Sequence, residues 1–221
     1  MAVGWAMPNR TRNEVGTMSS LLDLAPDHPA RMLANENSAF RKLVAHVRAD
    51  AQDACDLPDS ELDPALAYSI ANDTIALGRC VNHYRLKEES LVPALADRGE
   101  THVQTCVQNE DDRVRTCIWM AEALLQDAVE RPSGANLESV AFQLQDACDQ
   151  IETVADHEDE GLIPLALEIL DEKAWRHIAS ETKRPEYLPS AHVDLWTSPI
   201  DRAEAAIRRA IASGKLPGAA G

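Results

Sequence analysis

The chain of 221 residues is 45% apolar, which is enough to bury one sizeable core. Its net charge of −16 excludes a surface suited to nucleic acid or to anionic membranes. Only 4% of the residues are aromatic, and alternating runs of β-branched residues are missing, so we do not expect a sheet. The five cysteines have no CxxC spacing and are typical of reduced thiols, which indicates a cytoplasmic protein. No run of about 20 apolar residues predicts a membrane span.

In chain order, the sequence predicts a flexible leader over residues 1–26, a helical domain over 27–184 and an irregular tail over 185–221. Gly and Pro positions divide the domain into helices, because Pro suits a first turn and Gly a helix end. The short loops between the four longest helices favour an all-α, antiparallel up-down-up-down four-helix bundle with extra C-terminal helices. The predicted helices cover residues 29–54, 64–96, 101–130, 136–170 and 171–180, with an amphipathic helix over 199–213 in the tail.

Carboxylates interrupt the apolar stripe of each long helix where leucine is expected. They are Glu36, Glu88, Glu110 and Glu158. In an antiparallel bundle these four positions lie at the same end, so the side chains can converge on one layer. Such a layer is how di-metal carboxylate sites are built in helical bundles. The alternative is that several of these carboxylates lie at stripe edges and reach solvent.

Cationic side chains accompany the same layer. His83, Lys87 and Arg113 lie within one helical turn of Glu88 or Glu110. Buried carboxylates that pair with lysine and arginine need no metal to compensate their charge. The alternative for each cation is a solvated helix face.

Two segments resemble the HHE segment of hemerythrin-like proteins. Residues 82–93 read NHYRLKEESLVP and residues 154–164 read VADHEDEGLIP, so that acidic residues and an aliphatic pair precede a proline in both. Residues 36–40 and 108–110 are similar to the Glu-His and Gln-His-Glu stretches of that family. The resemblance covers residues 29–180 and implies a four-helix bundle of the family that binds two iron ions.

The metal ligands that the resemblance implies are mostly replaced. His83 and Glu158 match the family's pattern. The other ligand positions hold asparagine, lysine, arginine or valine. Asparagine is a weak iron ligand, valine cannot bind iron, and lysine and arginine repel a cation. A shift of one residue in the second helix would turn Tyr84 and Glu88 inward instead. The replaced ligand positions hold Asn37, Lys87, Asn109, Arg113 and Val154.

The preferred hypothesis is therefore a metal-independent acid/base enzyme of the isomerase, cyclase or lyase type. It would act on a small polar or anionic molecule without a cofactor, because opposed acids and bases in a core are expected to have shifted pKa values. Glu158 or Glu88 would be the base and His83 the acid. The remaining predicted roles are oxygen binding by Lys87 and Arg113 and substrate binding by Asn37, Asn109 and Tyr84.

Two alternatives remain. The first is a carboxylate-rich iron or manganese protein that handles oxygen, peroxide or nitric oxide. The second is a structural or partner-binding bundle without chemistry, in which the amphipathic helix over 199–213 docks a second subunit to form a homodimer. The ligands of the metal alternative would be Glu36, Glu88, Glu110, Glu158, His83 and His157.

Overall fold

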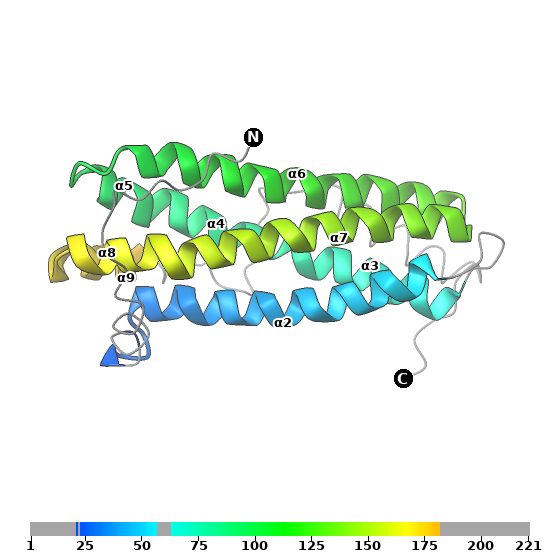
Figure 1. The fold of residues 1–221 in the computed structure, drawn as a ribbon, viewed down its shortest axis with the longest axis horizontal. Coiled ribbons are helices and arrows are strands. Elements are labelled where there is room, and N and C mark those ends of the chain that lie inside the picture. Colours follow the sequence, from blue (N-terminus) through cyan, green and yellow to red (C-terminus); the bar gives the residue numbers. More distant parts are fainter. Residues whose placement is uncertain (1–20, 22, 57–62, 182–221) are drawn as a thin grey trace. The chain divides into compact units, whose positions relative to one another are not determined.

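The computed structural model describes residue 21 and residues 23–56 and 63–181, and all regular structure within them is helical. This confirms the all-α prediction for the described residues. The predicted helix over 199–213 and almost all of the predicted leader lie outside them. The elements are α2 (Pro29–Cys55), α3 (Pro64–Gly78), α4 (Cys80–Leu86), η1 (Lys87–Leu91), α5 (Val92–Ala96), α6 (His102–Glu130), α7 (Gly134–His157), η2 (Glu158–Leu162), α8 (Ile163–Ile169) and α9 (Glu172–Glu181) (Figure 1).

The chain forms two compact units, and each long helix contributes to both. Unit 1 contains the start of α2 up to Arg41, the segment Val81–Asp111, and the chain from Glu152 through α9. Unit 2 contains Lys42–Cys80 and Asp112–Ile151. None of the helices that the structure describes is long and apolar enough to cross a membrane.

The predicted starts and stops of the helices have a clear local cause. Asp63 precedes α3 with an extended backbone, and its carboxylate accepts a hydrogen bond from the backbone N–H of Ala65 at 2.8 Å. Pro64 occupies the first turn, where its missing N–H costs nothing. After α5, Gly99 has a φ of +100°, a conformation that glycine adopts without strain, and the chain turns there toward α6.

The predicted helix over 64–96 is widened near its end by the π-helical turn η1. Pro93 has no N–H to donate to the carbonyl of Glu89, which lies four residues earlier. The N–H of Val92 instead donates to the carbonyl of Lys87, five residues earlier. The wider turn begins at Lys87, whose side chain it places in the interior.

The predicted helix over 136–170 contains the matching π-helical turn η2. Pro164 follows it as Pro93 follows η1, and the N–H of Ile163 donates to the carbonyl of Glu158. The carboxylate of Glu158 is buried at the first position of this turn. Turns of this kind occur frequently at functional sites. Both of them here begin with a charged residue that belongs to the site described below.

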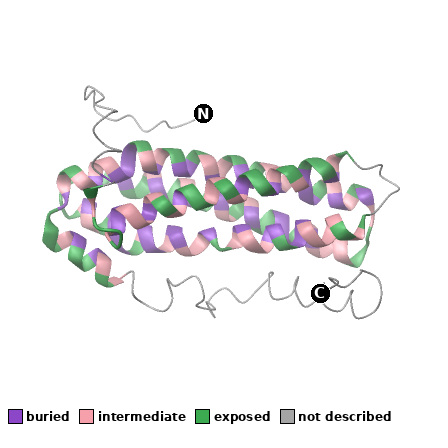
Figure 2. Ribbon diagram, turned by 90° about the horizontal axis from the view of Figure 1, so that it is seen from below, coloured by how far each residue is buried: buried purple, intermediate pink, exposed green. Residues whose placement is uncertain are grey.

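Each unit has an apolar core made by the buried stripes of its helices, which are visible as recurring purple segments in Figure 2. In unit 1 the buried ring of Trp175, from α9, belongs to the core, and its centroid lies 4.8 Å from that of the His28 ring. The main core residues of unit 1 are Leu33, Leu91, Leu95, Val103, Val107, Leu162, Ile163, Ala166, Trp175 and Ile178. Those of unit 2 include Val44, Val47, Ile70, Leu77, Val114, Ile118, Leu137, Val140, Leu144 and Ile151.

Candidate functional site

Lys87 is the centre of a polar group inside unit 1. Its side chain is only 1% exposed, and its ammonium donates hydrogen bonds to Asp111 Oδ1 at 2.8 Å and to Glu158 Oε1. The ring of Tyr84 lies one turn earlier, with its centroid 4.9 Å from Lys87 Nζ, where the ring face attracts the cation. The lysine therefore joins η1 to α6 and to η2.

His83 extends this group to α2. Its Nδ1 lies 2.7 Å from Glu36 Oε2 and its Nε2 lies 2.8 Å from Glu158 Oε2. The ring of Phe40 meets the imidazole edge-on at a centroid distance of 5.1 Å, which fixes the orientation of the ring. We call Glu36, His83, Lys87, Asp111 and Glu158 the polar core.

The charges of the polar core stabilise one another. Burial alone would lower the pKa of His83, but the charge of Glu158 and the bonds to Glu158 and Glu36 outweigh it and raise that pKa to about 9. Burial would likewise lower the pKa of Lys87, and the charges of Glu158 and Asp111 raise it above its ordinary value. Burial opposes ionisation of Glu158, yet Lys87 and His83 hold its pKa well below the usual range. At neutral pH these three groups are therefore charged.

Asp111 behaves differently from Glu158. Burial raises its pKa to about 7, against the opposing effect of the Lys87 charge. Its Oδ1 accepts from Lys87, while its Oδ2 has no hydrogen-bond partner among the described residues. Asp111 is thus a member of the polar core whose charge changes near neutral pH.

A second layer ties α2 to the end of α7 and to η2. Asn37 is buried and donates to Asp159 Oδ1 at 2.9 Å. Arg41 binds Asp159 at 2.7 Å and Asp156 at 2.8 Å. These contacts hold the helix that carries Glu36 beside the turn that carries Glu158.

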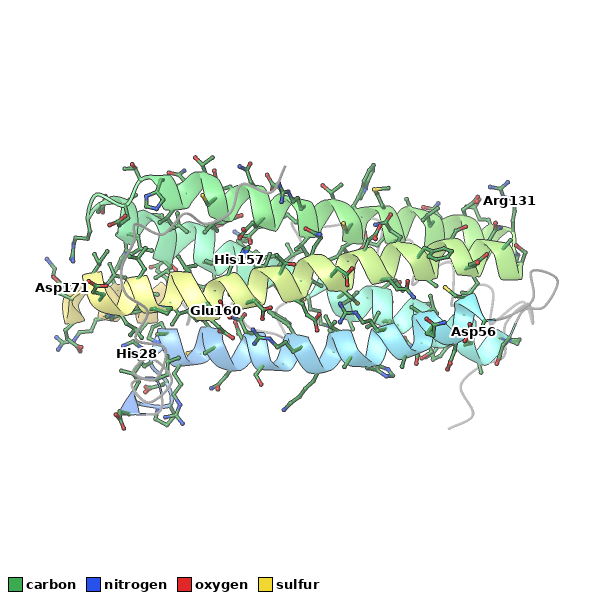
Figure 3. The ribbon with its side chains drawn as sticks, viewed as in Figure 1. His28, Asp56, Arg131, His157, Glu160 and Asp171 are labelled. Carbon is green, nitrogen blue, oxygen red and sulfur yellow. The ribbon has the colours of Figure 1, made fainter. Side chains whose placement is uncertain are left out.

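The structure does not bring every predicted site residue to the polar core. Glu110 lies apart from it, and its Oε1 is 2.8 Å from Nδ1 of His157, which is labelled in Figure 3. Glu88 is half-buried and close enough for its charge to act on Asp111. Asn109 and Arg113 are exposed. Of the four carboxylates predicted to form one layer, Glu36 and Glu158 belong to the polar core, whereas Glu88 and Glu110 do not. Asp111 takes the place that was expected for Glu110.

A small cavity lies beside the polar core. It is lined mainly by Met32, Leu33, Glu36, Lys87, Ser90 and Leu91, and it has room for about one water molecule. The hydroxyl of Ser90 donates to the carbonyl of Leu86 at 2.6 Å, so it is already bonded within its own helix. In this conformation the cavity is too small for an organic substrate.

The polar core does not fit a divalent metal as it stands. Both ring nitrogens of His83 lie within hydrogen-bonding distance of carboxylates, whereas a histidine that binds a metal must offer it an unprotonated ring nitrogen. The Lys87 ammonium also binds Glu158, the central carboxylate of the group. Iron or manganese would have to displace both of these cations.

Comparison of the chain with protein-family models and with curated protein sequences found no match. The resemblance to hemerythrin-like proteins thus depends on the motif residues themselves. The function of the site has to be inferred from its geometry.

Replacing Lys87 with methionine should destabilise the protein by about 3–5 kcal/mol, because it removes the ammonium that both buried carboxylates bind and leaves Glu158 with His83 as its remaining cationic partner. Chemical denaturation followed by circular dichroism measures this change. Lys42→Met is the matched control, since Lys42 is exposed and its loss should change the free energy of unfolding by less than about 0.5 kcal/mol. Equal small effects of both substitutions would contradict the central role of Lys87.

The stability of the protein should also fall as the pH rises from about 6.5 to 9. His83 binds its proton more tightly in the folded state, so its contribution is complete below 6.5, the pKa of a free histidine, and is lost as the pH passes about 9. The difference between these pKa values corresponds to about 3 kcal/mol. His83→Gln should remove this part of the pH dependence, whereas His102→Gln, at an exposed position, should keep it.

Proposed function

We propose that this chain is a hemerythrin-like four-helix bundle in which the polar core replaces the metal centre, and that it acts by binding a partner. The observation that supports this proposal best is the charge balance around Glu158. Two internal cations, Lys87 and His83, bind its two carboxylate oxygens directly. By the resemblance, all three side chains stand at ligand positions of the family, so the protein's own cations take the role of the metal charge.

The protonation states favour a structural role over turnover. A general acid or base works best when its pKa lies near the ambient pH. The pKa of His83 is raised to about 9, the pKa of Lys87 is raised above its ordinary value, and the pKa of Glu158 is lowered. The adjoining cavity admits about one water molecule. A closed, self-neutralised group of this kind stabilises one arrangement of helices.

Exposed apolar side chains support a binding role. In unit 2, Trp119 is 55% exposed and Phe142 is 54% exposed, although the chain has few aromatic residues. Aromatic side chains at a surface often become buried in an interface. We propose a second copy of this chain as the partner and the cytoplasm as its location.

If the polar core is structural, apolar side chains of similar volume should replace it. The combined variant His83→Leu, Lys87→Met, Asp111→Leu and Glu158→Met removes the four buried members of the polar core together, so that only the partly exposed carboxylate of Glu36 remains of it. Such replacements are often neutral or stabilising by about 1–4 kcal/mol. We expect the variant to fold, to keep the helical circular dichroism spectrum, and to restore the phenotype of a strain that lacks the gene.

A folded variant that fails to restore the phenotype would overturn the structural role and favour chemistry at the polar core. Iron bound with visible absorption bands that disappear in His83→Gln would favour the metal alternative. Lys42→Met again serves as the control for the procedure, because it changes an exposed lysine only.

A specific observation keeps acid/base chemistry as the second candidate. Glu36 has a 41% exposed side chain, lines the cavity and binds His83, so it connects solvent with the buried Glu158. Glu36, His83 and Glu158, together with Asp111, whose pKa is raised to about 7, form a series of groups along which a proton can pass. A small anion that enlarges the cavity would reach Lys87 there.

Formate is a suitable probe for this second candidate. If the cavity binds anions, formate should shift the imidazole NMR signals of His83 with a saturable dependence on its concentration. Ser90→Leu should abolish the shift by filling the cavity, whereas Lys42→Met should preserve it. The absence of a saturable shift in the unmodified protein would remove the support for a substrate site.

A further inference from the structure

A separate group of side chains in unit 2 has the composition of a metal site. His46 and Asp50 lie four residues apart on α2, so both side chains project from the same face of the helix. Asp73 joins them from α3. Each residue offers one potential ligand atom, and these three atoms lie within 4.8 Å of one another. Among the described residues, this is the group of histidine, cysteine and acidic side chains that is found so close together.

The distances suit a small divalent cation. His46 Nε2 lies 3.5 Å from Asp73 Oδ1. Metal–ligand bonds of about 2.1 Å in a tetrahedral site place neighbouring ligand atoms about 3.4 Å apart.

The burial of Asp73 provides a second, independent indication of a ligand. Asp73 is 3% exposed, and its Oδ2 has no hydrogen-bond partner among the described residues. An unsatisfied buried carboxylate oxygen costs free energy, so its position calls for a partner. One carboxylate oxygen of Asp50 lies within 4.8 Å of a carboxylate oxygen of Asp73, and a cation between two such groups would offset the repulsion between their like charges.

The surroundings support the orientation of the ligands. The hydroxyl of Ser69, from α3, donates to Asp50 Oδ2, in the way that second-layer hydrogen bonds orient metal-binding carboxylates. The side chain of His46 is 60% exposed, which gives a cation access from solvent and leaves room for water ligands.

We propose that His46, Asp50 and Asp73 form a binding site for a divalent first-row transition metal, with Zn²⁺ as the probe. One imidazole nitrogen and two carboxylate oxygens are ligands that zinc, cobalt and manganese accept, whereas calcium and magnesium prefer oxygen alone. The site is independent of the polar core, which lies in unit 1.

Isothermal titration of the full chain with Zn²⁺ tests the proposal. We expect saturable binding of one ion, a higher midpoint of thermal unfolding with Zn²⁺, and a shift of the His46 imidazole NMR signals. His46→Ala and Asp73→Asn should each weaken binding at least tenfold. Since His46 is exposed, its substitution should leave the fold intact, and Asp73→Asn keeps the volume of the buried side chain.

His102→Ala is the matched control, because His102 is also exposed and lies 3.5 Å from a single carboxylate, that of Glu100. It should bind Zn²⁺ as the unmodified protein does. No saturable binding, or equal binding by the His46→Ala variant, would overturn the proposal and leave a shared proton between Asp50 and Asp73. Neither result affects the polar core, so this test stands apart from the proposed function.

Discussion

The contact of Lys87 with Glu158 and Asp111 is the interaction on which the interior of unit 1 depends. An ion pair at 2.8 Å, the distance to Asp111, is worth about 6 kcal/mol at an effective dielectric constant of about 20. Removing the charges from water costs several kcal/mol per ion, so the net gain is small. The cost of breaking the contact is large, however, because the remaining charges stay buried. The group therefore constrains which side chains can meet in the core more than it adds to stability.

The two π-helical turns allow a buried charge and the buried residues that follow it to face the core together. Each turn lies directly before a proline-containing segment, and each begins with a member of the polar core, Lys87 or Glu158. Without the extra residue per turn, the side chains that follow would be rotated by about 100° relative to the core. The repeated proline of the two motif segments thus has a structural consequence, and the site is built from a local deformation that both segments share.

The sequence predicted the helices well, because long amphipathic stripes and clear end signals specify them. His83, Lys87 and Glu158 were predicted in the interior since each interrupts such a stripe or matches the motif. The π-helical turns and the interruption of the second predicted helix at Arg79 were not predicted, since their cause lies in backbone hydrogen bonds.

Asp111 was missed because residues three and four positions after Val107 both fit a helical stripe. Glu110, three positions after Val107, was predicted to face the core. The residues that are buried along this helix are instead Val107, Asp111, Val114 and Ile118. Asn109 was included through the resemblance to the family motif, and Arg113 because it also lies within one helical turn of Glu110; both are exposed. Periodicity alone cannot separate such neighbours, because the rotation of a helix is set by its packing partners.

The two units show two ways in which a helical protein accommodates buried carboxylates. In unit 1, cations from the chain itself bind Glu158, so its charge is retained. In unit 2, burial raises the pKa of Glu122 to about 7, and neither of its oxygens has a partner among the described residues. Glu122 therefore reaches neutrality by taking up a proton. Asp73 lies between these cases: its pKa is raised to about 6 by burial and by Asp50, and its nearest cationic group is an exposed histidine. Asp73 is buried beside His46 and Asp50, so the cation proposed for this group would compensate its charge from outside the chain.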